Sequence, residues 1–178
     1  MIYSNNLVEK IEIKKISACT ADSMRMKFIA QADKPLGDIL PILYLYIPNA
    51  NYSEKLGCLT YTYQMHLITI FSNGKISMTY VKDENEAEQL MKEVKNLINR
   101  AIIYFRNYGK PDEKLLNIKK QINPMQIYKI LPKINCKKCG EESCYAFSVK
   151  LFSGKKNLRD CPYVNINELE KILQPIKI

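Results

Sequence analysis

Residues 72–106, SNGKISMTYVKDENEAEQLMKEVKNLINRAIIYFR, contain a turn, an alternating strand and a long amphipathic helix in direct succession. Asn73-Gly74 is the strongest short-range signal for a β-hairpin, because both central positions of a type I′ turn need positive φ. In residues 75–82 apolar side chains occupy every second position, which predicts a half-buried strand. A hairpin followed by a helix predicts an antiparallel sheet covered by that helix, which is an α+β fold.

The helix is predicted over about 84–106. Asp83 can cap its first turn, with Glu86 three residues later, as in a capping box. We interpret its apolar stripe as the face that packs on the sheet rather than as a cofactor-binding surface, because this spacing is typical of a core-facing helix. The stripe consists of Ala87, Leu90, Met91, Val94, Leu97, Ile98, Ala101, Ile102 and Phe105.

The residues before this stretch supply the rest of the predicted sheet. Two runs, 10–18 and 24–32, alternate loosely and predict strands. Residues 59–71 are rich in Thr, Tyr and Ile and predict a further strand, which contains His66, the one histidine of the chain. Residues 36–45 are apolar and predict a short helix. We therefore expect an N-terminal antiparallel sheet that carries one long amphipathic helix.

A boundary follows this helix. Gly109 and Pro111 stop helices, and the stretch around them has the composition of a linker. We therefore predict an α+β domain over 1–108, a linker over 109–123 and a small helical domain over 124–178.

Two helices are predicted near the ends of this second domain. Asn123 and Pro124 suit the N-cap and first residue of a short helix that runs to Leu131. A final helix is predicted from Asn167 to Gln174. Its inward-facing residues would be Leu169, Ile172 and Leu173.

The composition is that of a soluble globular protein. Of 178 residues, 47% are hydrophobic and 25% are charged, and no run reaches the ~18–20 apolar residues that span a bilayer. The first residues lack a basic region followed by an apolar one, so we expect no signal peptide and a cytoplasmic protein. In a reducing cytosol cysteines serve as metal ligands, catalytic thiols or buried apolar residues rather than as disulfides.

The six cysteines are unevenly distributed. Cys19 and Cys58 stand alone, and we expect them to be small buried apolar residues. The other four have the spacing Cys-x2-Cys-x4-Cys-x16-Cys, in which three ligands come from a tight loop and the fourth from elsewhere. This arrangement favours one [4Fe–4S] cluster over zinc, because zinc sites usually show two paired-cysteine knuckles. The expected ligands are Cys136, Cys139, Cys144 and Cys161.

The neighbouring residues suit a negatively charged cluster. Gly140 lets the loop turn with positive φ. Cys144 should open a helix that ends at Gly154, and a helix N-terminus stabilises an anion. Lys137 and Lys138, between the first two ligands, add positive potential.

The run from Leu131 to Leu151, followed by Gly154 and Asp160-Cys161-Pro162, resembles a known iron–sulfur domain. It is similar to the four-iron–four-sulfur domain of the corrinoid iron–sulfur protein large subunit, which is the gamma subunit of the acetyl-CoA decarbonylase/synthase complex. The same domain occurs in the B subunit of Rnf-type electron-transport complexes. The resemblance implies cluster ligation by the same four cysteines, and a small stand-alone iron–sulfur protein of an anaerobe.

The resemblance has limits. The family often has glycine after the first ligand, where this chain has Lys137. The family's corrinoid-binding barrel is not implied, because a chain of this length is too short to hold it. Residues 1–120 resemble only loosely the front halves of small anaerobic proteins that end in the same domain.

The leading functional hypothesis is a one-electron transfer or accessory redox module for a corrinoid protein, a methyltransferase or another anaerobic redox system. The chain carries a net charge of +9, and residues 124–162 hold eight basic and three acidic residues, so we expect an acidic protein partner. A sensing cluster in a nucleic-acid-binding protein is a second hypothesis, although no helix-turn-helix or aromatic-basic RNA motif supports it. A structural zinc module is a further alternative.

The sequence offers little for catalysis. It contains no Gly-rich phosphate loop and no hydrolase triad, so we do not expect an enzyme in its own right. A catalytic subunit with a substrate site in residues 1–120 stays open as a hypothesis. Such a site would be a cleft lined by Cys19, Cys58 or His66.

Overall fold

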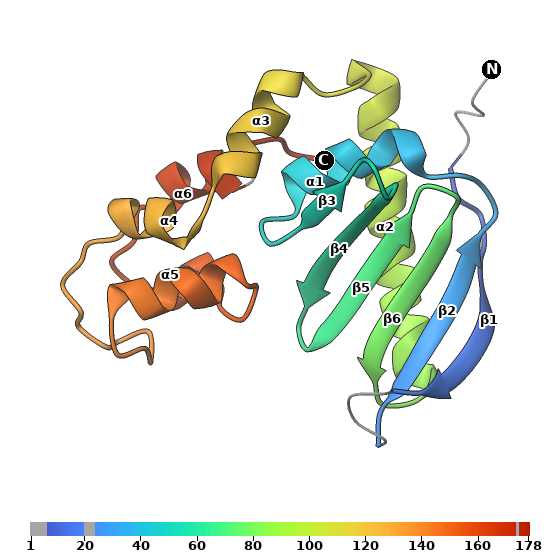
Figure 1. Cartoon of the computed structure of the whole chain (residues 1–178), viewed down its shortest axis with the longest axis horizontal. Coiled ribbons are helices and arrows are strands. Elements are labelled where there is room, and N and C mark those ends of the chain that lie inside the picture. The colour runs from blue at the N-terminus through green and yellow to red at the C-terminus, as the bar shows by residue number, and fades with distance from the viewer. Residues whose placement is uncertain (1–6, 20–23, 174) are drawn as a thin grey trace.

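A computed structural model describes residues 7–19, 24–173 and 175–178 of the chain. It contains a six-stranded antiparallel sheet in the order β1-β2-β6-β5-β4-β3, which confirms the predicted α+β class. Helices α1 and α2 lie on the sheet, and α4, α5 and α6 gather in a second lobe (Figure 1). The strands are β1 Ile11–Ala18, β2 Met26–Ala32, β3 Asn51–Ser53, β4 Cys58–Tyr63, β5 His66–Phe71 and β6 Lys75–Val81.

The helices follow the predicted order, with one addition between the lobes. The short helix near the N-terminus is a 3-10 turn η1 (Gly37–Ile39) that continues into α1. The α-helices are α1 Leu40–Tyr46, α2 Glu84–Tyr108, α3 Glu113–Gln121, α4 Pro124–Ile130, α5 Cys144–Phe152 and α6 Ile166–Leu173, with a second 3-10 turn η2 over Leu158–Asp160. None of the described helices is both long and apolar enough to cross a membrane.

The local signals at the hairpin and at α2 form as predicted. Gly74 has φ 86° and its N–H donates to the carbonyl of Phe71 at 3.0 Å, which closes the turn between β5 and β6. At α2, the Asp83 carboxylate accepts from the N–H of Glu86 at 2.9 Å. The Glu86 carboxylate in turn accepts from the N–H of Lys82 at 2.6 Å. The first turn of α2 is thus capped from both sides.

The region 51–71 differs from the prediction. Residues 59–71 form two strands, β4 and β5, instead of one, and they turn at Gln64, whose φ is 54°. No Gly, Pro or Asn marks that turn, so the sequence carried no signal for it. His66 consequently begins β5 rather than lying inside a longer strand. The three-residue β3 at the sheet edge was not predicted.

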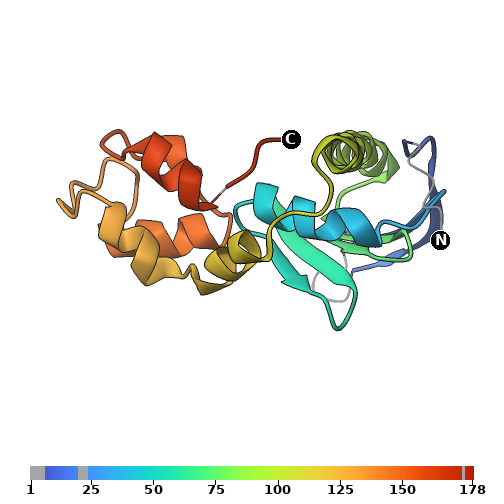
Figure 2. The same cartoon turned by 90° about the horizontal axis from the view of Figure 1, so that it is seen from above.

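The main core lies between the sheet and its helices. One face of each central strand is buried at every second residue, and the α2 stripe packs over that face as expected. Figure 2 shows α1 and α2 on the same side of the sheet. The largest fully buried side chains here include Phe28, Leu40, Ile42, Leu43, Leu45, Leu59, Ile68, Ile70, Ile76 and Met78.

A second, smaller core holds the C-terminal lobe together. It joins α4, α5 and α6 through Ile127, Phe147, Leu151, Leu169 and Leu173. The predicted caps of α4 are present, since the side chain of Asn123 accepts from the N–H of Gln126 at 3.1 Å and Pro124 opens the helix. The predicted final helix forms as α6, and Leu169 and Leu173 point inward; Gln174 and the side chain of Ile172 lie outside the described residues.

The segment between the lobes, expected to be a linker, contains helix α3. Its Lys119 is only 5% exposed. The ammonium group donates to the carbonyls of Leu45 at 3.3 Å, Ile47 at 2.7 Å and Leu173 at 3.0 Å, and also to that of Tyr44. These carbonyls end α1 and α6, so one cation joins helix C-termini of both lobes.

Candidate metal centre

The loop between α4 and α5 carries the first two predicted ligands. It contains an unusual run of left-handed residues: Lys133 (φ 58°), Asn135 (46°), Lys137 (59°) and Gly140 (79°). A non-glycine residue in this region costs roughly 1–2 kcal/mol, so such conformations persist only where their surroundings impose them. Lys137 occupies the position where the resembled family often has glycine, and its positive φ gives the physical reason for that preference.

The third predicted ligand, Cys144, is the first residue of α5, as expected. The hydroxyl of Ser143 caps the helix by accepting from the N–H of Ala146 at 3.0 Å. The side-chain oxygen of Asn135 accepts from the N–H of Cys144 at 2.8 Å. Asn135 therefore ties the strained loop to the helix start, a role that sequence reasoning missed although Asn is one of the residues that tolerate positive φ.

The fourth predicted ligand, Cys161, follows η2. The carboxylate of Asp160 accepts from the N–H of Asn157 at 2.9 Å, and the N–H of Asp160 donates to the carbonyl of Asn157 at 3.1 Å. This reciprocal pair closes a tight turn, and Cys161 leaves it with its side chain in the small core at 7% exposure. A residue 17 positions after Cys144 is thus brought back beside it by tertiary packing.

All four cysteines line one hollow in the C-terminal lobe. Cys144 and Cys161 are buried, Cys139 is half-buried and Cys136 is exposed, and none forms a disulfide. The lining is completed by Leu131, Pro132, Asn135, Lys137, Glu141, Ser143 and Phe147. Over the described residues, no three thiol, carboxylate or imidazole groups converge on one point as the ligands of a single ion would.

An ion pair between a buried carboxylate and a half-exposed lysine supports the wall of this hollow. Glu141 is 6% exposed and accepts from Lys150 of α5, with oxygen–nitrogen distances of 2.7 and 2.9 Å. The hydrogen bond from Lys150 holds the pKa of Glu141 below its ordinary value. Lys156 lies 3.7 Å from the same carboxylate and donates to the carbonyl of Cys139 at 2.9 Å. These two cations leave a net positive charge beside the ligand loop.

The other residues considered from the sequence lie away from this hollow. Cys19 is buried, as expected, and Cys58 is half-buried in β4. His66 is 4% exposed, and its Nε2 lies 3.7 Å from a carboxylate oxygen of Glu86. All three belong to the sheet lobe, while Glu141 and Lys156 are the site residues that the sequence did not single out.

The residues of the hollow suit an anionic iron–sulfur cluster. Four thiolates around a [4Fe–4S]2+ core leave a net charge of −2. The start of α5 and the lysines of the loop stabilise negative charge at this place. The buried side chains of Leu131, Phe147 and Leu151 exclude water on the inner side. The donor set, the charge and the apolar wall therefore fit the group that the sequence predicts.

Comparison with known proteins bears on the same region. Residues 131–163 match the family described as "Putative Fe-S cluster". The acetyl-CoA decarbonylase/synthase complex subunit gamma of Methanocaldococcus jannaschii is 50% identical over 52 residues, which are 29% of this chain and 11% of that protein. The corresponding subunit of Methanothermobacter thermautotrophicus is 44% identical over 52 residues, with the same coverage of both chains.

The corrinoid/iron-sulfur protein large subunit of Moorella thermoacetica is 54% identical over 41 residues, which are 23% of this chain and 9% of that protein. The matched segment thus spans only about a tenth of the length of these relatives. No solved structure matches the chain significantly. The chain therefore contains a segment that matches an iron–sulfur family, and its alignments with these three relatives cover 41 to 52 residues.

Proposed function

We propose that Cys136, Cys139, Cys144 and Cys161 bind one [4Fe–4S] cluster and that the protein serves as a one-electron carrier. The observation that carries this proposal is that the four thiols line one hollow, although 16 residues separate the last two in the sequence. When bound, the cluster supplies reversible one-electron chemistry between its 2+ and 1+ states. The protein supplies four thiolates, a positive environment and an apolar inner wall.

An exposed face of α5 offers a docking surface for the redox partner. Tyr145, Val149 and Phe152 follow one another at spacings of four and three residues and are 45%, 40% and 39% exposed. The same helix begins with Cys144, so a partner on this face would lie close to the cluster. Exposed apolar side chains of this kind are typical of contact surfaces.

The charge around this face indicates the partner's chemistry. Lys137 and Lys138 lie in the ligand loop and Lys150 lies on α5. Glu142 pairs with Lys137, and Glu141 pairs with Lys150. A positive surface speeds association with an acidic protein. We therefore propose an acidic redox protein as the partner and do not propose nucleic acid or a membrane.

The relatives suggest the metabolic setting. Their names place the shared domain in the acetyl-CoA decarbonylase/synthase complex and in a corrinoid/iron-sulfur protein. By extension, the chain would be a cytoplasmic accessory redox module of an anaerobe, working with a corrinoid protein or a methyltransferase. Residues 1–108 would form the domain that recognises that system, and 124–178 the cluster domain.

The test is anaerobic purification of the full chain with iron and sulfide analysis, and EPR of the dithionite-reduced protein. We expect about four irons and four sulfides per chain and the signal of a reduced cubane cluster. Cys161→Ser should lose most of the iron and sulfide, whereas Cys58→Ser, a half-buried thiol in the sheet lobe, should keep both. One zinc per chain without sulfide would replace this proposal with a structural zinc module.

A further inference from the structure

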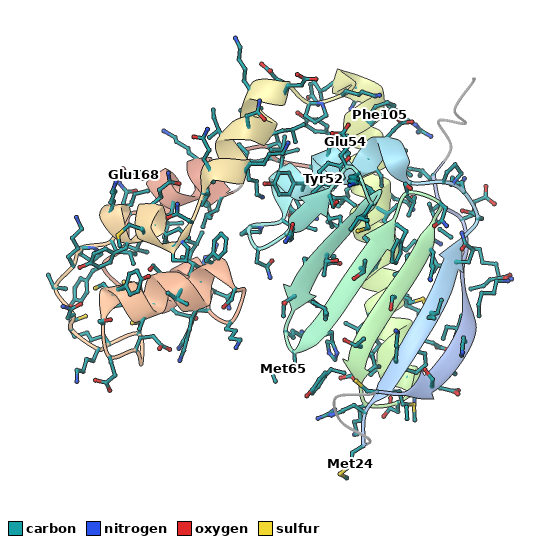
Figure 3. All side chains as sticks on the ribbon, viewed as in Figure 1. Met24, Tyr52, Glu54, Met65, Phe105 and Glu168 are labelled. Atoms are coloured by element: carbon teal, nitrogen blue, oxygen red, sulfur yellow. The ribbon has the colours of Figure 1, made fainter. Side chains whose placement is uncertain are left out.

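A large cleft separates the sheet lobe from the cluster lobe and is distinct from the cysteine hollow. Its volume is about 1090 Å³, slightly above the ~300–1,000 Å³ typical of ligand pockets. One wall is the β4–β5 hairpin with the middle of α2, and the other is the turn at 154–159 that follows α5. Figure 3 shows Met65 at the tip of that hairpin.

The sheet-lobe wall is apolar and aromatic. Ile68, Leu90 and Val94 line its floor and are buried within the main core. Tyr61 of β4 is 6% exposed, while Tyr63 near the hairpin tip is 39% exposed. Aromatic side chains next to an aliphatic floor present a surface on which a flat ring can pack.

The opposite wall carries two basic side chains that form no hydrogen bond or ion pair with the described residues. Lys155 and Arg159 line the cleft, and neither side chain has a hydrogen-bond or ion-pair partner among the described residues. Two carboxylates also line it, those of Glu93 and Glu170. Glu93 is engaged with Tyr63, and its hydrogen bond raises the pKa of that phenol. The unpaired cations are therefore available to an incoming anion.

The cleft also touches the ligand loop of the metal centre. Lys156 lines the cleft while donating to the carbonyl of Cys139. Gly154 closes one end, because a Cβ at this residue would lie 2.0 Å from the side-chain nitrogen of Asn49 in the other lobe. The two lobes thus approach each other closely at this end of the cleft.

From these features we infer that the interlobe cleft binds a small anionic molecule with an aromatic body. The ring would pack on Tyr46, Tyr63 and Leu97, which line the cleft and are partly exposed, and the anionic group would contact Lys155 and Arg159. A charged hydrogen bond and an apolar floor at opposite ends fix the orientation of such a ligand. The inference goes beyond cluster binding and does not require it.

The test uses 8-anilinonaphthalene-1-sulfonate, whose naphthalene ring and sulfonate match the two ends of the cleft and whose fluorescence rises on burial. We expect saturable binding to the folded full-length protein, both with and without iron. The double variant Lys155→Ala/Arg159→Ala should weaken binding roughly tenfold or more, because each charged hydrogen bond contributes a factor of this order. Thr62→Trp should weaken it as well by filling the cleft.

The control replaces two other exposed lysines, in Lys92→Ala/Lys120→Ala. It changes the net charge equally, and neither lysine lines the cleft. This control should bind the probe as the natural chain does. In competition, naphthalene-1-sulfonate should displace the probe, and the neutral 1-naphthol should do so at least tenfold less well. Equal losses in the two double variants, or equal displacement by both competitors, would overturn the inference, whatever the iron analysis shows.

Discussion

The substitution Lys119→Met tests whether the buried ammonium group of this residue joins the two lobes. Methionine keeps most of the side-chain length and removes the ammonium group that contacts four carbonyls at the ends of α1 and α6. Its three N–H donors form charged hydrogen bonds worth about 1.5–3 kcal/mol each, against a desolvation cost of several kcal/mol. We expect a net loss of about 3 kcal/mol in the free energy of unfolding.

The pH dependence provides an independent signature. Burial lowers the pKa of Lys119 to about 7 from an ordinary value of 10.5. Between these two pH values the unfolded chain binds more protons than the folded one, so this group makes the protein more stable as the pH rises from 7 toward 10. The slope is at most about 1.4 kcal/mol per pH unit. Below pH 7 the contribution of this group is constant.

The measurement is urea unfolding of the full chain followed by far-ultraviolet circular dichroism at pH 7, 8 and 9. Lys120→Met, on the next and exposed residue of the same helix, is the matched control and should change stability by less than about 0.5 kcal/mol. The Lys119→Met protein should lack the rise with pH that the natural chain and the control show. Equal losses of stability in the two variants would show that the buried ammonium group does not join the lobes. A rise with pH that persists in Lys119→Met would show that a group other than Lys119 causes it.

The remaining predictions concern the cysteine hollow. Lys137→Gly should raise the free energy of unfolding of the cluster-free protein by about 1 kcal/mol in urea titrations, because glycine accepts a φ of 59° without strain. The control Lys138→Gly replaces a residue without positive φ and should lower this free energy. A stabilising Lys138→Gly together with a destabilising Lys137→Gly would contradict the strain argument. In Asn135→Ala the N–H of Cys144 loses its acceptor, so the visible absorbance of the cluster should decay about tenfold faster after a chelator is added. An unchanged decay time would show that this hydrogen bond is dispensable. Glu141→Gln should lower the thermal midpoint at pH 7. The difference in midpoint from the natural chain should shrink as the pH falls below about 4.5, because the pKa of Glu141 is lowered in the folded state and its stabilisation is lost on protonation. A difference in midpoint that does not change with pH would contradict this.

Many elements were predictable because their signals are local. The cap of α2 at Asp83, the turn at Gly74 and the start of α4 at Pro124 each depend on residues no more than four apart. Such short-range hydrogen bonds and φ preferences are nearly the same in a peptide as in the folded protein. The apolar stripe on α2 was also predictable, because a period of 3.6 residues indicates a buried helix face. The period does not indicate which element packs against that face.

The features that the sequence did not predict depend on residues that are distant along the chain. The turn at Gln64 has no residue suited to positive φ, and pairing of β4 with β5 imposes it. Helix α3 was not predicted, and the contacts of its Lys119 with carbonyls more than 50 residues away in sequence fix its place. Ile176, at the far end of the chain, packs into the main core. Each of these features depends on partners that adjacent residues do not reveal.

The candidate centre shows the same division. The cysteine spacing predicted which thiols could act together, and the residues from Cys144 to Gly154 predicted a helix that Cys144 begins. Both predictions depend on residue type and short-range order. Only packing of α4, α5 and α6 around one core brings Cys161 beside the loop, buries Glu141 between two lysines and opens a cleft behind Lys156. Those arrangements depend on contacts between distant segments, whose free energy is realised only when the whole chain has folded.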